Sequence, residues 1–213
     1  MVINFIKGII VGLLASIPLG PVGVLCLQRT LNKGRESGFI TGMGSALADT
    51  FFAAVALLSL AFVDLFLSKY HNETLIIGGI IVLLFGVSIL FKNPIKQIRR
   101  PKTSKKGLVG DFFSANFIVI TNPGALFILL GLFAFIGIDT TANETNMLLA
   151  ITLLGVFIGA SSWWFLLTAI VNHFRNKFRL RQLLYINQIS GIIIIVLGMI
   201  STFEGLYQII KLL

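Results

Sequence analysis

Cysteine and histidine are nearly missing from this sequence. One cysteine, Cys26, and two histidines occur in 213 residues. A single cysteine excludes a disulfide within the chain and a paired-cysteine redox motif. The histidines, His71 and His173, lie between apolar blocks and form no cluster with metal-ligand spacing. No nucleophile with an adjacent base appears within the apolar blocks either. We therefore expect no metal centre, no cofactor and no enzyme.

Charged residues are also scarce, at 12% of the chain, whereas 56% is hydrophobic and the mean hydropathy is +0.97. A soluble domain of this length needs more polar surface. The apolar residues form blocks of about 20 residues, which is the length that crosses a hydrocarbon core of about 30 Å. Backbone groups in lipid must be paired within helices. The sequence predicts an all-α membrane protein with six transmembrane helices, over residues 5–27, 38–67, 75–91, 112–138, 147–171 and 183–210.

The net charge of +9 comes from basic residues that are concentrated in three loops. Fourteen of the 17 lysines and arginines follow the first, third or fifth apolar block. Because basic loops stay in the cytoplasm, this pattern predicts a multi-pass protein of the bacterial inner (plasma) membrane with both termini outside. Anionic lipid head groups account for the basic loops, so we expect contact with the lipid bilayer and no nucleic acid partner.

The two halves of the chain carry similar features in the same order. Proline and glycine occur near the middle of both the first and the fourth block, at 18–21 and 123–124. The third block has glycines at 79 and 86, and the sixth has them at 191 and 198. We expect a three-helix repeat over residues 1–98, a basic cytoplasmic linker over 99–110 and a second three-helix repeat over 111–213. Because each half has an odd number of spans, the repeats have inverted topology, as is typical of secondary transporters.

Prolines inside the first and fourth blocks predict broken helices. Proline removes a backbone hydrogen bond and clashes with the preceding turn, so Pro18, Gly20 and Pro21 should interrupt the first span. Pro123, followed by Gly124, should interrupt the fourth. Such breaks expose half-helix ends that suit an ionic substrate. The alternative is a kink with a purely structural role.

Asp49 is an acidic residue well inside an apolar stretch. A charge at the membrane centre costs about 2.5–3.5 kcal/mol on insertion scales, so the carboxylate should face a partner or a wet cavity. It could bind a substrate ammonium group, a coupling proton, or each in turn. Alternatively, it could be a structural acid that accepts hydrogen bonds from backbone freed at the breaks.

Further polar and aromatic residues in the second half are candidates for the same site. Thr121 and Asn122 in the fourth block and Ser161 in the fifth could hydrogen-bond a substrate carboxylate, or could join helices to one another. Trp164 lies in mid-span rather than at an interface, where tryptophan is usually enriched. It could flank a cationic substrate by a cation–π contact, or could serve packing alone.

Several motifs taken together resemble the LysE family of exporters, which includes lysine exporters and homoserine/threonine resistance proteins. They are Pro18-Leu-Gly-Pro21, the glycines at 34, 38, 42 and 44 that lead to Asp49, the pair Asn122-Pro123, and Asn187 with Gly191 and Gly198. The resemblance implies a proton-driven exporter of amino acids or similar small metabolites, and a homodimer. It also implies functional roles for Asp49 and for both proline breaks. Many family members have a lysine directly after the asparagine–proline pair, and this chain has Gly124 there.

One alternative function remains open at this point. Related six-helix families resemble this one and export metal ions. Such a transporter needs several oxygen or sulfur ligands within the membrane, and the sequence offers one aspartate with scattered amides.

Overall fold

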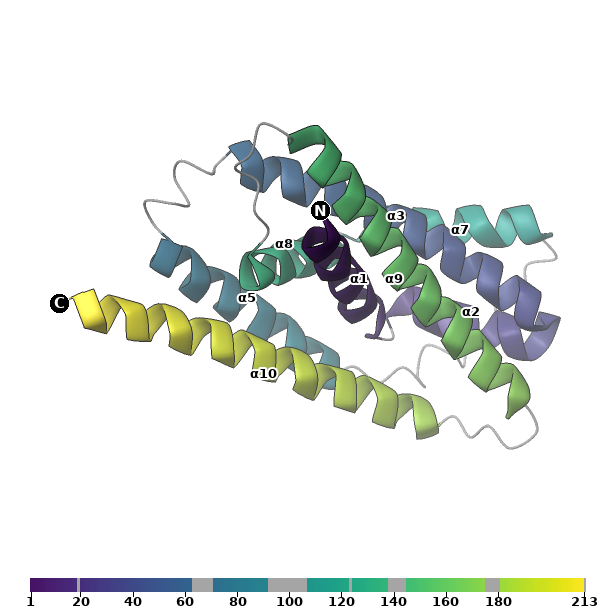
Figure 1. Ribbon diagram of the computed structural model, residues 1–213. Coiled ribbons are helices and arrows are strands. Elements are labelled where there is room, and N and C mark those ends of the chain that lie inside the picture. The colour runs from purple at the N-terminus through teal and green to yellow at the C-terminus, as the bar shows by residue number, and fades with distance from the viewer. Residues whose placement is uncertain are drawn as a thin grey trace.

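The computed structural model describes residues 1–18, 20–62, 71–91, 107–122, 124–137, 145–174 and 181–212 (Figure 1). Within these ranges the chain is all-helical. The helices are α1 (Val2–Ser16), α2 (Pro21–Lys33), α3 (Arg35–Phe62), α5 (His71–Phe91), α7 (Leu108–Ile120), α8 (Gly124–Ile136), α9 (Thr145–His173) and α10 (Arg181–Leu212). The predicted linker is described only from residue 107 onward, and Pro123 lies outside the described residues.

Length and composition identify α3, α9 and α10 as helices that can cross a membrane. Two further spans are added if α1 with α2 and α7 with α8 each count as one broken span, since each pair is apolar enough together. The first pair is bent by 79° and the second by 70°. The predicted breaks in the first and fourth apolar blocks are therefore present. Within α5, the apolar stretch Ile76–Phe91 is shorter than the three helices that can cross a membrane by themselves. The chain is thus a multi-pass membrane protein.

The outer faces of the helices carry large apolar side chains. Exposed examples come from five helices: Phe51, Leu84, Phe117, Leu154 and Ile192. Lipid tails solvate such a surface, whereas water would not. Several buried hydroxyls donate to the carbonyl one turn back, as those of Thr41, Thr152 and Thr168 do.

Glycines let the helices approach closely at three contacts. In the pair α5 and α10, a Cβ added to Gly79 would meet the Gly198 carbonyl, and one added to Gly86 would meet the Gly191 carbonyl. Glycines of α1 and α9 face one another in the same way, and Gly44 of α3 packs on the backbone of α7. Figure 1 shows α5 and α10 side by side along one edge of the molecule, with α1, α3, α7 and α9 on the other side of α8. Close backbone approach of this kind is how membrane helices gain packing without a hydrophobic driving force.

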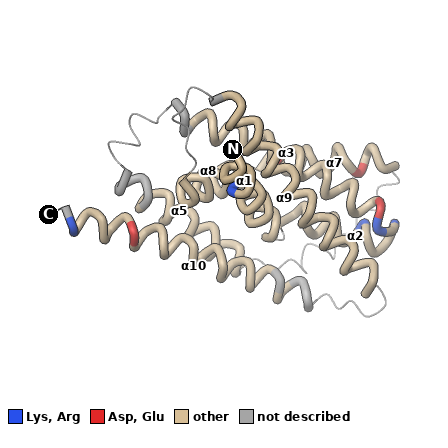
Figure 2. The backbone as a smooth tube through the Cα atoms, viewed as in Figure 1, with Lys and Arg blue, Asp and Glu red and all other residues tan. Residues whose placement is uncertain are grey.

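Charged residues of the described helices gather mainly at one end of the bundle (Figure 2). There α2 ends at Lys33, Gly34 turns the chain with a positive φ of 103°, and α3 begins at Arg35. Glycine adopts this backbone conformation without the steric cost that a Cβ would add. The turn places the basic end of α2 beside the beginning of α3.

Candidate functional site

The two helix breaks meet at one cavity of about 130 Å³. At roughly 30 Å³ for each water in the liquid, this volume holds about four waters or a small organic molecule. The described residues of its wall come from both breaks and from α3, α5, α9 and α10. They are Ala15, Ser16, Pro18, Gly20, Pro21, Val22, Gly23, Ser45, Asp49, Phe85, Ser88, Ile89, Ile118, Val119, Asn122, Gly124, Ala125, Ile128, Trp164 and Asn187.

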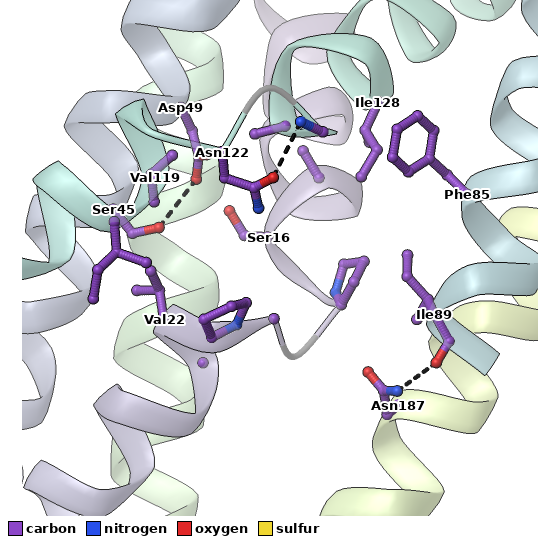
Figure 3. A pocket seen from close by; sticks show the side chains of 18 of the residues that line it. Ser16, Val22, Ser45, Asp49, Phe85, Ile89, Val119, Asn122, Ile128 and Asn187 are labelled. Atoms are coloured by element: carbon purple, nitrogen blue, oxygen red, sulfur yellow. Dashed lines mark hydrogen bonds between the residues drawn. The ribbon is translucent and has the colours of Figure 1, made fainter. Parts of the chain in front are cut away.

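Asp49 supplies the carboxylate of this wall. The residue is 8% exposed, and the Ser45 hydroxyl donates to its Oδ2 over a long 3.4 Å. Ser45 lies one helical turn before Asp49 and therefore on the same face of α3. In Figure 3 the Ser16 hydroxyl lies between the Asp49 and Asn122 side chains. A carboxylate held this loosely keeps most of its hydrogen-bonding capacity for another partner.

Two buried donors in the wall have no hydrogen-bond partner within the described part of the chain. They are the Ser16 hydroxyl and the Trp164 indole N–H, and each residue is 3% exposed. A buried donor without a partner costs about 1–3 kcal/mol. Such a cost at a cavity wall is expected where a water or a ligand completes the hydrogen bond.

The beginnings of α2 and α8 differ although both follow a break. Gly20 precedes α2 in an extended conformation, with φ −74° and ψ −167°, and no side chain caps the helix. At α8, Asn122 Oδ1 accepts a hydrogen bond of 3.1 Å from the Gly124 N–H. One half-helix end is therefore capped by a side chain of the chain itself, and the other is left open to the cavity.

Most of the residues that the sequence singled out come together at this cavity. Six line it: Asp49, Pro18, Gly20, Pro21, Asn122 and Trp164. Thr121 is not part of the wall, and its hydroxyl donates to Phe117 O at 2.8 Å and Ile118 O at 3.2 Å. Ser161 is not part of the wall either, and its hydroxyl is buried without a partner among the described residues.

Sequence reasoning missed several residues of the wall. Ser16 and Ser45 are small polar residues within one helical turn of a predicted break or of Asp49, which is the signal that could have found them. Asn187, named above as a motif residue, also borders the cavity, where its Nδ2 donates to Ile89 O at 2.6 Å and links α10 to α5. The apolar side chains of the wall, such as Phe85 and Ile128, carry no distinctive sequence signal.

A buried ion-pair network lies away from the cavity and was also missed. Asp111 of α7 is 1% exposed and pairs with Arg29 Nε at 3.1 Å and Lys33 Nζ at 2.9 Å, both on α2. Ser37 of α3 donates to the same carboxylate at 2.5 Å. Arg29 also donates to Thr41 of α3 at 2.9 Å. The network ties α2, α3 and α7 together at the charged end of the bundle.

Comparisons with known proteins identify the family of the chain. The sequence model of the LysE type translocator family matches residues 13–203. The chain is also similar to the "Putative amino acid efflux protein YcgF" of Bacillus subtilis (strain 168), with 26% identity over 218 residues that cover 97% of this chain and 98% of that protein. No solved structure gives a significant match. On the family match, which spans nearly the whole sequence, this chain belongs to the LysE type translocator family.

Proposed function

We propose that this protein exports amino acids or related small metabolites from the bacterial cytoplasm across the inner (plasma) membrane, in exchange for protons. Substrate and proton bind in turn at Asp49, in the cavity between the two helix breaks. The observation that carries this proposal is a loosely held carboxylate inside a membrane helix that borders a cavity lined by both breaks. The family and the name of the Bacillus subtilis relative support the substrate class.

Energetics favour a functional role for Asp49 over a structural one. A carboxylate at mid-membrane costs about 2.5–3.5 kcal/mol unless it is satisfied. Asp111, buried at the charged end of the bundle, is stabilised by two cations and a hydroxyl at short distances. Asp49 has two neighbouring hydroxyls, Ser45 at 3.4 Å and Ser16, and no cation in the described wall of the cavity. We therefore infer that Asp49 binds a ligand or a proton during transport.

We further propose two inverted three-span halves, residues 1–98 and 111–213, joined by a linker over 99–110. Reciprocal contacts support this arrangement. Gly79 would collide with the Gly198 carbonyl if it carried a Cβ, and Gly198 with the Gly79 carbonyl, and the same holds for Gly86 and Gly191. A two-fold relation between halves requires such mutual contacts. In the same sense, α1 packs on α9 as α7 packs on α3.

Departures from this symmetry indicate how access could alternate. In the proposed repeat α2 corresponds to α8, and α5 corresponds to α10. The α8 helix packs on α5, where the Phe85 and Phe127 rings stack with centroids 6.3 Å apart. Among the described residues no comparable packing joins α2 to α10, and α2 packs on α3 instead. Pro21 of α2 and Asn187 of α10 border the cavity. We propose that the cavity opens between α2 and α10. Since α2 runs from the cavity to the basic residues at its end, this opening faces the cytoplasmic side. The opposite state would close α2 on α10 and open α8 from α5.

Efflux from proteoliposomes tests the role of Asp49. Asp49→Asn keeps the size of the side chain but removes the charge and the exchangeable proton. We expect it to abolish efflux driven by a pH gradient while the protein still elutes as a folded species in detergent. Glu36→Gln is the matched control, because Glu36 is an exposed acid at the start of the same helix, and it should transport normally. Unchanged efflux by Asp49→Asn would remove this carboxylate from the mechanism.

A further inference from the structure

The described cavity wall has an acidic side chain but no basic one, and this limits which substrates it can bind. Among its described residues Asp49 is the one ionisable group with a negative charge, and none is a lysine, arginine or histidine. A substrate ammonium group can therefore be neutralised by a side chain, whereas a substrate carboxylate cannot. Any negative group on the substrate must be met by backbone or neutral donors.

The uncapped beginning of α2 offers such donors. The first N–H groups of a helix have no partner within the helix, and Val22 and Gly23 occupy these positions and line the cavity. No side chain caps them. The matching end of α8 is less available, because Asn122 already accepts from Gly124 N–H. A helix beginning carries a partial positive charge, which favours an anion at this place.

An independent observation points to a ligand at the same wall. The Ser16 hydroxyl and the Trp164 indole N–H are buried donors without partners in the described chain, and both residues line the cavity. The Ser16 hydroxyl lies in the interior of the cavity, beside Asp49 (Figure 3). A carboxylate bound near α2 would satisfy a donor of this kind.

The remaining wall carries no charge, and its polar side chains, Ser45, Ser88, Asn122 and Asn187, are set among apolar ones. Phe85, Ile89, Ile118 and Ile128 come from α5, α7 and α8 and present no charge to the cavity. A second charge on the substrate side chain would lose its hydration there without gaining an opposite charge. An apolar side chain would gain from the same contact.

We propose that the substrate is an α-amino acid with an uncharged, apolar side chain, such as leucine. Its ammonium group pairs with Asp49, and its carboxylate accepts from the open beginning of α2, with the Ser16 hydroxyl as a further donor. Its side chain lies against the wall around Phe85. This assignment rests on the proposed function and narrows its substrate class.

Direct binding to the purified full chain in nanodiscs tests the assignment by calorimetry. L-leucine should bind, and two truncated analogues should bind about tenfold or more weakly, because each loses a charge-assisted interaction. Isoamylamine lacks the carboxylate, and isocaproate lacks the ammonium group. L-lysine and L-glutamate should be excluded to a similar degree.

A substitution at Gly20 tests where the carboxylate binds. A Cβ added to Gly20 meets nothing within 4 Å, so an aspartate fits and can cap α2 in place of the substrate. We expect Gly20→Asp to weaken leucine binding by about tenfold or more while the thermal stability stays equal or rises. Gly107→Asp is the matched control, since Gly107 is an extended, uncapped N-cap of α7 with equally open space, away from the cavity. It should leave leucine binding intact.

The outcomes separate this inference from the proposed function. If lysine or glutamate binds and is exported while leucine is not, the substrate class is wrong and the exporter stands. If Gly20→Asp binds leucine as tightly as the parent chain does, the carboxylate does not lie at α2 and the inference is overturned. If no amino acid binds or is exported, both proposals fail.

Discussion

A designed disulfide between α5 and α8 tests whether these helices must separate during transport. A Cβ added to Gly78 lies 3.7 Å from the Ala134 Cβ and meets no other atom within 4 Å. Disulfides have a mean Cβ–Cβ distance of about 3.8 Å. Gly78→Cys together with Ala134→Cys should therefore cross-link without moving the backbone. Closing a loop of about 57 residues should stabilise the folded chain by about 4 kcal/mol.

Efflux from proteoliposomes should fall to background when this pair is oxidised and return when it is reduced. The reason is that the proposed opposite state needs α8 to leave α5. Thermal unfolding in detergent should move to higher temperature in the oxidised protein, so that lost transport cannot be assigned to unfolding. The native Cys26 is buried and can remain. Each single cysteine variant should transport under oxidant as it does under reductant. Full efflux by quantitatively cross-linked protein would refute the exchange of α8 contacts as the gating motion.

Two further predictions concern stability, measured by thermal unfolding in detergent. Asp111→Asn should destabilise by about 3–5 kcal/mol, because it leaves Arg29 buried without its counter-charge, whereas Lys33→Met should cost much less since the Lys33 side chain is 29% exposed. Equal losses in the two variants would contradict the assignment of Asp111 to Arg29. Gly79→Val should cost about 1–3 kcal/mol, because its Cβ would meet the Gly198 carbonyl at 2.9 Å. Gly78→Val, with Ala134 3.7 Å away, should be mild, and a reversed order would disprove the close contact of α5 with α10.

The helix breaks and the carboxylate could be predicted from the sequence because each follows from local chemistry. Pro21 lacks the N–H that would continue α1, and it is well suited to the first position of a new helix. The structure ends α1 at Ser16 and begins α2 at Pro21. Asp49 was noticeable because an acid in a long apolar run is costly wherever the run packs. Neither argument needs knowledge of a distant contact.

Other features depend on pairings between residues that are far apart in the chain. Arg29 and Asp111 are 82 positions apart, and nothing in the pattern of either segment specifies the partner. Thr121 and Asn122 are neighbours with similar sequence arguments, yet the chain direction after α7 turns Asn122 toward the cavity and leaves Thr121 bonded to its own helix. Side-chain direction at the end of a helix is decided by packing, which periodicity does not report.

Gly124 affects both the shape of the cavity and the charge of its wall. A Cβ at this position would lie 3.1 Å from Asn122 Oδ1 and 3.2 Å from Phe85 Cε1. The glycine therefore allows Asn122 to cap α8 and allows Phe85 to close against the same end. A lysine, which members of the family that the sequence resembles often carry here, would crowd Phe85 and Asn122 and would add a cation to the wall of the cavity. Without that lysine Asp49 has no cation in the described wall, so the substrate must bring one. In the proposed binding mode the substrate carboxylate then binds at the open beginning of α2, and the missing lysine side chain determines which end of the substrate each half of the site binds.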